Sequence, residues 1–120
     1  MKDDVTLSVL SGSTSGRPIA VAATSSPGTA IHTASFGSAT DGHDVITLYA
    51  HNIDTVDRLL YLQIGGTGTS DQLGPIRLQP NGVPALVFQG PLTASLIVKA
   101  YADAASKINI FGDVSKWEAS

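Results

Sequence analysis

Short runs of alternating apolar and polar residues fill most of this chain, and clusters of Gly, Pro, Ser, Thr, Asn and Asp separate them. The clearest run is 44–52, in which Val45, Thr47 and Tyr49 alternate with Ile46, Leu48 and Ala50. A period of two places alternate side chains on opposite faces of a β-strand. Only 53–62 is compatible with a helix, and its second half is equally compatible with a strand. The pattern therefore predicts an all-β fold.

Nine segments are candidate strands: 5–10, 18–23, 29–34, 44–52, 59–64, 75–79, 83–89, 95–102 and 107–114. Pro80-Asn81-Gly82 predicts a tight hairpin between two of them, because Asn-Gly accepts the positive φ that such turns require. Pro75 and Pro84 are expected at strand starts, and Gly90-Pro91 between strands. Eight to nine short antiparallel strands separated by frequent turn signals predict a β-sandwich or jelly-roll-like single domain.

With 120 residues, the chain has the length of one domain. Within it, we expect residues 1–17 to form an N-terminal strand or arm with an exposed loop, and residues 18–120 to form the β-sandwich domain. No apolar signal-peptide core follows Met1, and no stretch approaches the ~18 apolar residues of a membrane helix. We therefore expect synthesis in the cytoplasm and no membrane partner.

Charged residues are scarce, at 14% of the chain against about 25% in an average soluble protein. Two interpretations stay open: a neutral surface rich in Ser and Thr, or a surface largely buried against other subunits. The seven Lys and Arg residues are scattered singly and the net charge is −3. Because neutralising phosphates requires clustered cations, we expect no direct binding of nucleic acid.

No group of residues indicates catalysis, and we predict no catalytic residue, cofactor or metal. Cysteine is absent, and Glu118 is the only glutamate. His43 and His51 bracket one predicted strand and would lie about 26 Å apart at 3.3 Å per residue. An enzyme remains an alternative, and it would require a pocket in which His32 meets an aspartate.

Carbohydrate binding is a second alternative, because β-sandwiches often bind sugars through exposed aromatic side chains. The aromatic residues are few, and most of them fall inside predicted strands, where they are expected to fill the core or an interface. Trp117 lies in a polar tail and is expected to contact a neighbouring subunit.

Most of the chain, from about Pro18 to Val114, resembles small virion proteins of tailed bacteriophages, namely head decoration (cement) proteins. The resemblance lies in strand and turn patterns and not in catalytic motifs. The segments that carry it are 20–34, 44–52, 62–67, Asn81-Gly82, Gly90-Pro91-Leu92, 98–102 and 109–114.

The resemblance implies a β-rich structural protein of the virion, often a homotrimer, that binds the outer surface of the phage head. Its partner would be the major capsid protein, whose lattice it would stabilise against the pressure of packed DNA. Trimer formation would also account for the low charge, since interface cores are depleted in charged residues. The predicted interface residues are Val5, Leu7, Val9, Tyr49, Tyr101 and Trp117. A carbohydrate-binding or host-adhesion module of the virion is the alternative function.

Overall fold

Nine strands make up almost all of the regular structure in residues 4–80 and 82–119, the part of the chain that the computed structural model describes. The fold is all-β, as the alternation predicts. The strands are β1 (Asp4–Ser8), β2 (Ile19–Ala20), β3 (Thr29–Thr33), β4 (Gly42–Asn52), β5 (Arg58–Ile64), β6 (Gln72–Leu78), β7 (Ala85–Leu92), β8 (Ile97–Ala102) and β9 (Ile108–Glu118). A single 3₁₀ turn, η1 (Thr69–Asp71), precedes β6. In the described residues, no helix has the length and apolar character needed to cross a membrane.

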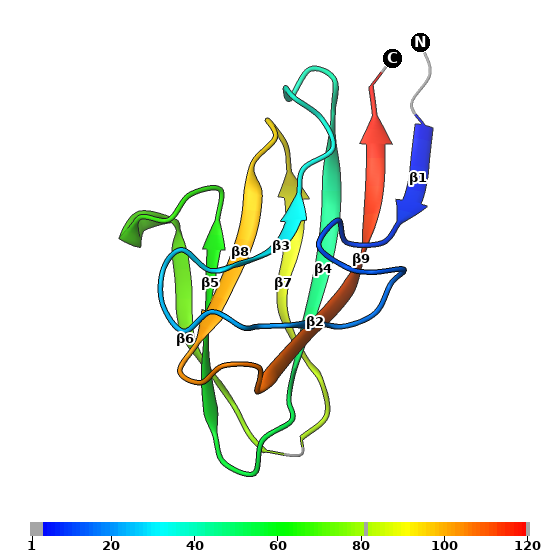
Figure 1. Cartoon of the computed structure of the whole chain (residues 1–120). Coiled ribbons are helices and arrows are strands. Elements are labelled where there is room, and N and C mark those ends of the chain that lie inside the picture. The colour runs from blue at the N-terminus through cyan, green and yellow to red at the C-terminus, as the bar shows by residue number, and fades with distance from the viewer. Residues whose placement is uncertain (1–3, 81, 120) are drawn as a thin grey trace.

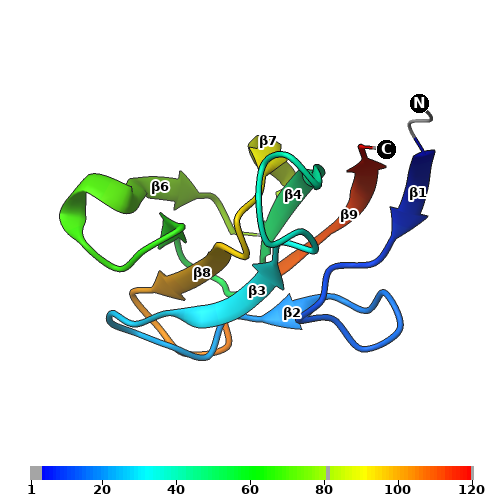
Figure 2. The same cartoon turned by 90° about the horizontal axis from the view of Figure 1, so that it is seen from above.

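Two antiparallel sheets face each other (Figures 1 and 2). Sheet A has the order β1-β9-β4-β7, and the short strand β2 also pairs with β9. Sheet B has the order β3-β8-β5-β6. The strands of the two sheets alternate along the chain, so most connections cross from one sheet to the other.

The pairing is nested, with outer strands joining outer strands and inner strands joining inner ones. β1 pairs with β9, β3 with β8, β4 with β7 and β5 with β6, all antiparallel. A long hairpin that is wrapped into two sheets gives this order, which is the topology of a jelly roll. The predicted sandwich class is thus confirmed, and the nested order gives its topology.

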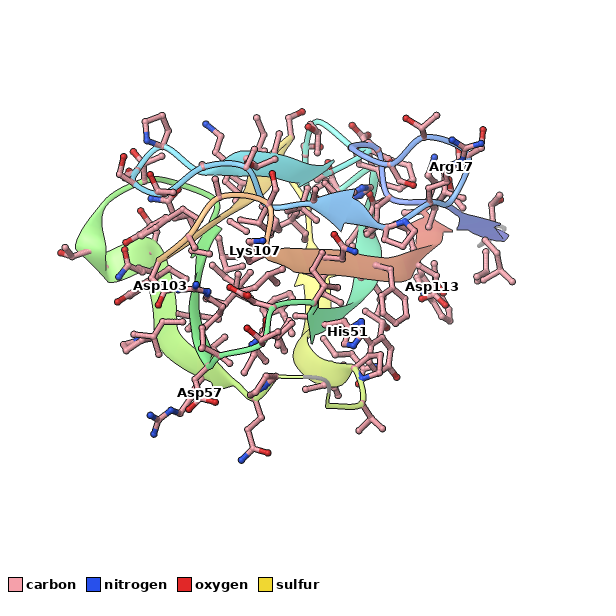
Figure 3. All side chains as sticks on the ribbon, turned by 60° about the horizontal axis from the view of Figure 1, so that its bottom comes forward. Arg17, His51, Asp57, Asp103, Lys107 and Asp113 are labelled. Carbon is pink, nitrogen blue, oxygen red and sulfur yellow. The ribbon has the colours of Figure 1, made fainter. Side chains whose placement is uncertain are left out.

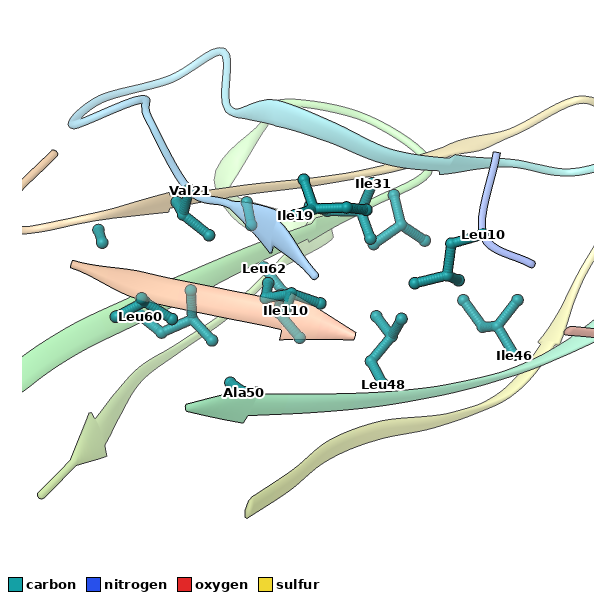
Figure 4. Packing of buried hydrophobic residues seen from close by; sticks show 14 of the residues in the cluster. Leu10, Ile19, Val21, Ile31, Ile46, Leu48, Ala50, Leu60, Leu62 and Ile110 are labelled. Atoms are coloured by element: carbon teal, nitrogen blue, oxygen red, sulfur yellow. The ribbon is translucent and has the colours of Figure 1, made fainter. Parts of the chain in front are cut away.

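The core lies between the sheets and consists almost entirely of aliphatic side chains (Figure 4). In β4 the even-numbered residues from Gly42 to Asn52 are buried and the odd-numbered ones are half-buried, as the period of two predicts. The fully or nearly buried hydrophobic residues are Leu10, Ile19, Val21, Ile31, Ala34, Ile46, Leu48, Ala50, Leu60, Leu62, Leu78, Leu92, Val98, Ala100, Ala102, Ile108, Ile110 and Val114.

The predicted hairpin at Pro80-Asn81-Gly82 is wrong. β6 and β7 lie in different sheets, where β6 pairs with β5 and β7 with β4. Asn81 itself lies outside the described residues. An Asn-Gly pair favours a local chain reversal, but burial of the apolar faces decides which strands then pair. Here it places Leu78 and Leu92 in the common core from opposite sheets.

Three further residues lie elsewhere than predicted relative to the strand boundaries. Pro75 lies inside β6 and Pro91 inside β7. Both strands are at sheet edges, where the missing N–H of proline disrupts no hydrogen-bond ladder. Trp117 does not lie in a tail, because β9 continues to Glu118 by pairing with both β1 and β4.

The N-terminal segment is packed onto the sandwich. β1 pairs with β9 along its whole length, from Asp4 with Glu118 to Ser8 with Val114. Leu10 then enters the core with only 1% of its surface exposed, and the Gly12 amide donates to the carbonyl of Ile31 at 2.9 Å. The segment therefore joins the edges of both sheets.

Replacing Leu10 by alanine should lower the free energy of unfolding by about 2–4 kcal/mol, because it leaves a cavity in a close-packed core. Val9→Ala is the matched control. Because Val9 is half-exposed, its replacement should lower the free energy of unfolding by about 0.5 kcal/mol or less. Urea denaturation of both variants provides the measurement. Equal effects would show that Leu10 does not anchor the segment.

Candidate functional site: the outer face of sheet A

The strand register places a continuous set of side chains on the outer face of sheet A, which points away from the core. Val5 of β1, Trp117 of β9 and His43 of β4 form one row across the sheet. Leu7, Ser115, Val45 and Pro91 form the next. The remaining rows are Asp113, Thr47 and Gln89, then Phe111, Tyr49 and Leu86, then Asn109 and His51.

Apolar and aromatic side chains make up about half of this face, and several are well exposed. Leu7 has 77% of its surface exposed, Leu86 52%, Val5 49% and Trp117 43%. Asp113 is the one carboxylate in the five rows, and no Lys or Arg lies in them. Figure 3 labels four further charged residues, and all four lie in loops: Arg17, Asp57, Asp103 and Lys107. The face thus combines exposed apolar area with little charge, as protein-binding surfaces do.

Two aromatic pairs stiffen the face. The rings of His43 and Trp117 are nearly parallel, with centroids 6.3 Å apart, and those of Tyr49 and Phe111 stack at 5.5 Å. Both are cross-strand pairs between β4 and β9, a kind of contact that stabilises a sheet. Aromatic rings fixed in this way lose little conformational entropy on binding.

Four of the six predicted interface residues lie together on this face: Val5, Leu7, Tyr49 and Trp117. Val9 follows β1 and lies beside Gly16 of the next loop. Tyr101 belongs to β8 of sheet B. It stacks on Tyr61 at 4.7 Å and its hydroxyl donates to Gln72, so its polar end is satisfied within the chain.

The outer face of sheet B differs because a loop of the chain covers part of it. Gln63 of β5 is completely buried under residues 26–28. The Gly28 amide donates to its side-chain oxygen at 2.9 Å, and its side-chain nitrogen donates to Ser26 Oγ at 2.8 Å. Sheet A has no such cover on its outer face in the described residues.

The sequence did not predict that Val45, Leu86 and Phe111 would join this face. Val45 and Phe111 follow the alternation of their strands, so the sequence of each strand indicates which of its side chains share a face. The pairing of β4 with both β9 and β7 could not be predicted, because it connects segments far apart in the chain.

A buried polar cluster lies inside the sandwich, near the end of β4. His32 Nε2 and Asp44 Oδ2 are 2.7 Å apart, and both side chains are almost completely buried. The amide and the hydroxyl of Ser35 donate to the same carboxylate oxygen, each at 2.9 Å. The Ser11 amide donates to His32 Nδ1 at 3.0 Å. Both ring nitrogens are therefore occupied.

The meeting of His32 with an aspartate is the arrangement that the enzyme alternative requires, but its surroundings differ from those of a reactive site. Only 2% of the His32 side chain and none of the Asp44 side chain is exposed. A general base needs a ring nitrogen within reach of a substrate proton. In the described residues, no group of three or more His, Asp or Glu side chains could hold a metal ion.

Asp54 is the residue whose acidity the structure shifts clearly. The Thr55 amide and the Arg58 side chain donate to its carboxylate at 2.7 and 2.8 Å. These hydrogen bonds and the positive charge hold the pKa of Asp54 below its usual value. The group lies in the loop between β4 and β5, so its ion pair with Arg58 fixes this connection.

Comparisons of this chain with protein-family models, with curated proteins and with solved structures find no match. The class of protein must therefore be argued from the fold and from the outer face of sheet A.

Proposed function

We propose that this protein is a structural component of a virus particle: a decoration or cement protein that binds the outer surface of a bacteriophage head. In this role it would dock on the lattice of the major capsid protein through the outer face of sheet A and bridge neighbouring shell subunits. The observation that carries the proposal is the exposed apolar and aromatic surface of that face, with a single carboxylate among its rows.

Three features of the chain support this proposal. Two stacked aromatic pairs fix side chains of the face, and such pre-ordered rings suit docking on another protein. The chain resembles phage head decoration proteins in its strand and turn pattern. The jelly roll also occurs in viral capsid domains, although the same fold hosts lectins and enzymes, so fold alone assigns no function.

Burial of the outer face also gives a reason for the low charge of the chain. A stable interface buries about 800 Å² from each partner, and a five-strand face with exposed Leu7, Leu86 and Trp117 offers apolar area for it. Each Å² of apolar surface removed from water contributes about 25 cal/mol before the costs of association. We propose a homotrimer as the docking unit, which light scattering over a dilution series tests directly.

Trp117 is the only tryptophan of the chain, so its fluorescence reports on the proposed interface. Adding undecorated phage heads should shift its emission to shorter wavelength as the half-exposed ring leaves water. Leu7→Lys should weaken this binding at least about tenfold, because a charge then has to be desolvated at an interface position. Leu96→Lys is the matched control: Leu96 is also exposed but precedes β8 of sheet B. Equal loss in both variants would contradict the proposed face.

Carbohydrate binding remains a second candidate because of one observation. A hollow of about 180 Å³ lies beside Trp117 and His43, bounded also by Ala39 and Glu118, and an exposed tryptophan next to a carboxylate suits stacking of a sugar ring. Binding to a glycan array that Trp117→Ala abolishes and Leu7→Lys preserves would favour this function over docking on a capsid.

A further inference from the structure

His32 connects the N-terminal segment to the interior of the sandwich by hydrogen bonds. Its Nε2 meets Asp44 of β4 inside the core, and its Nδ1 accepts from the Ser11 amide. The Ser11 hydroxyl accepts in turn from the Thr33 amide at 2.7 Å. We call these bonds, with the Gly12 amide to the Ile31 carbonyl, the N-terminal latch.

The tautomer of His32 follows from its two partners. An amide N–H can only donate, so Nδ1 must carry a lone pair. The ring proton is then on Nε2 and points to the Asp44 carboxylate, which accepts it together with the two bonds from Ser35. The hydrogen bonds of the latch therefore require a neutral ring with its proton on Nε2.

A second proton on His32 would have to enter at Nδ1, the position that the Ser11 N–H faces. Two donors would then oppose each other at a distance that is now 3.0 Å, and the amide would have to leave. The bond to Asp44 would be kept and strengthened, because it would join an imidazolium to a carboxylate. Protonation thus breaks the hydrogen bond from the Ser11 amide and strengthens the one to Asp44.

The register places two further charged residues near Asp44, both on β9. Lys116 of β9 is the register partner of Asp44 and takes the same side of sheet A, with Glu118 two residues further on. Leu92 of β7 is the partner of Asp44 on its other side, and Val98 of β8 is the partner of His32. The ion pair described for His32 is the one with Asp44.

We propose that His32 is a proton-operated latch: uptake of a proton on Nδ1 releases the Ser11 amide and loosens residues 4–12 while the remaining sandwich stays folded. Histidine is the side chain that changes charge in mildly acidic conditions. The proton comes from solvent. Because β1 carries Val5 and Leu7, loosening would also disturb the outer face of sheet A; that consequence alone depends on the proposed function.

Amide hydrogen exchange measured by NMR tests the latch in the purified protein, without any partner. Between about pH 7.5 and about pH 5, the protection factors of Ser11, Gly12 and the β1 amides should fall roughly tenfold, the effect of a buried donor losing its acceptor. Protection of Ile46 and Leu48 in the core should not change. In the same samples, the long-range ¹H–¹⁵N spectrum of His32 should show the Nε2–H form at neutral pH.

Asp44→Asn separates a titrating latch from a purely structural contact. The carboxylate favours the imidazolium, so its removal should move the loss of protection to lower pH. Changing His43 and His51 to Gln together should leave the pH at which protection is lost unchanged, since both residues lie on the outer face of sheet A. Protection that is independent of pH, or an Nδ1–H form at neutral pH, would overturn the proposal, and both are read on the unchanged protein even if Asp44→Asn does not fold.

Discussion

Replacing Gly112 by alanine should destabilise the protein by about 3 kcal/mol or more, the upper part of the range for overpacking. Gly112 lies in the middle of β9 opposite Leu48 of β4. A Cβ built on it overlaps the carbonyl oxygen of Thr47 and approaches the Thr47 carbonyl carbon to 2.8 Å. These are backbone atoms of the central strand pair, so no side-chain rotation can relieve the overlap.

Gly90→Ala is the matched control for this prediction, because Gly90 lies in the same sheet, on β7. A Cβ there meets the Phe88 ring at 3.5 Å, an ordinary contact. We expect the free energy of unfolding of this variant, measured in urea, to lie within about 1 kcal/mol of the parent value. If Gly112→Ala were as stable as Gly90→Ala, the close approach of β9 to β4 would be incorrect.

Replacing His32 by leucine should lower the free energy of unfolding by about 3–5 kcal/mol, because it leaves the Asp44 carboxylate buried without its ring donor. One carboxylate oxygen, Oδ1, is already buried without a hydrogen-bond partner within the described chain. The remaining Oδ2 would then have only the two bonds from Ser35. Chemical denaturation at neutral pH measures the effect.

The double variant His32→Leu with Asp44→Leu tests whether the cost arises from the stranded charge. Replacing both members of a buried pair by apolar side chains is often nearly neutral, whereas removing one partner is costly. We therefore expect the double variant to be more stable than His32→Leu by about 1 kcal/mol or more. A double variant as unstable as the sum of both single changes would show that the two groups contribute independently.

Local periodicity was enough to predict the fold class. Within a single strand, it also predicted which side chains share a face. In β4, the alternation of Ile46, Leu48 and Ala50 with Val45 and Tyr49 separates core from surface correctly. It does so because a strand with one buried face has to alternate. The same argument placed Val5 and Leu7 on a common side of β1, where the structure has them.

Pairing between distant strands could not be predicted in the same way. The Asn81-Gly82 dipeptide indicates a chain reversal but does not specify whether the next strand stays in the sheet. Asp44 meets His32, which lies twelve residues away in the chain and on the opposite sheet. The spacing of residues in the sequence does not predict such contacts across the core. For the same reason Tyr101 was grouped with residues of sheet A although it belongs to sheet B.

The nested order of the strands determines when the fold can be completed during synthesis. β9 is the ninth of the nine described strands in chain order, yet it lies between β4 on one side and β1 with β2 on the other. Until β9 emerges from the ribosome, sheet A lacks an inner strand, and the edges of β1 and β4 that face β9 are unpaired. Long-range pairing of this kind is slow to form, and unpaired edges invite association with other chains. A chaperone or a high dilution should therefore raise the yield of refolding more than a stabilising core substitution would.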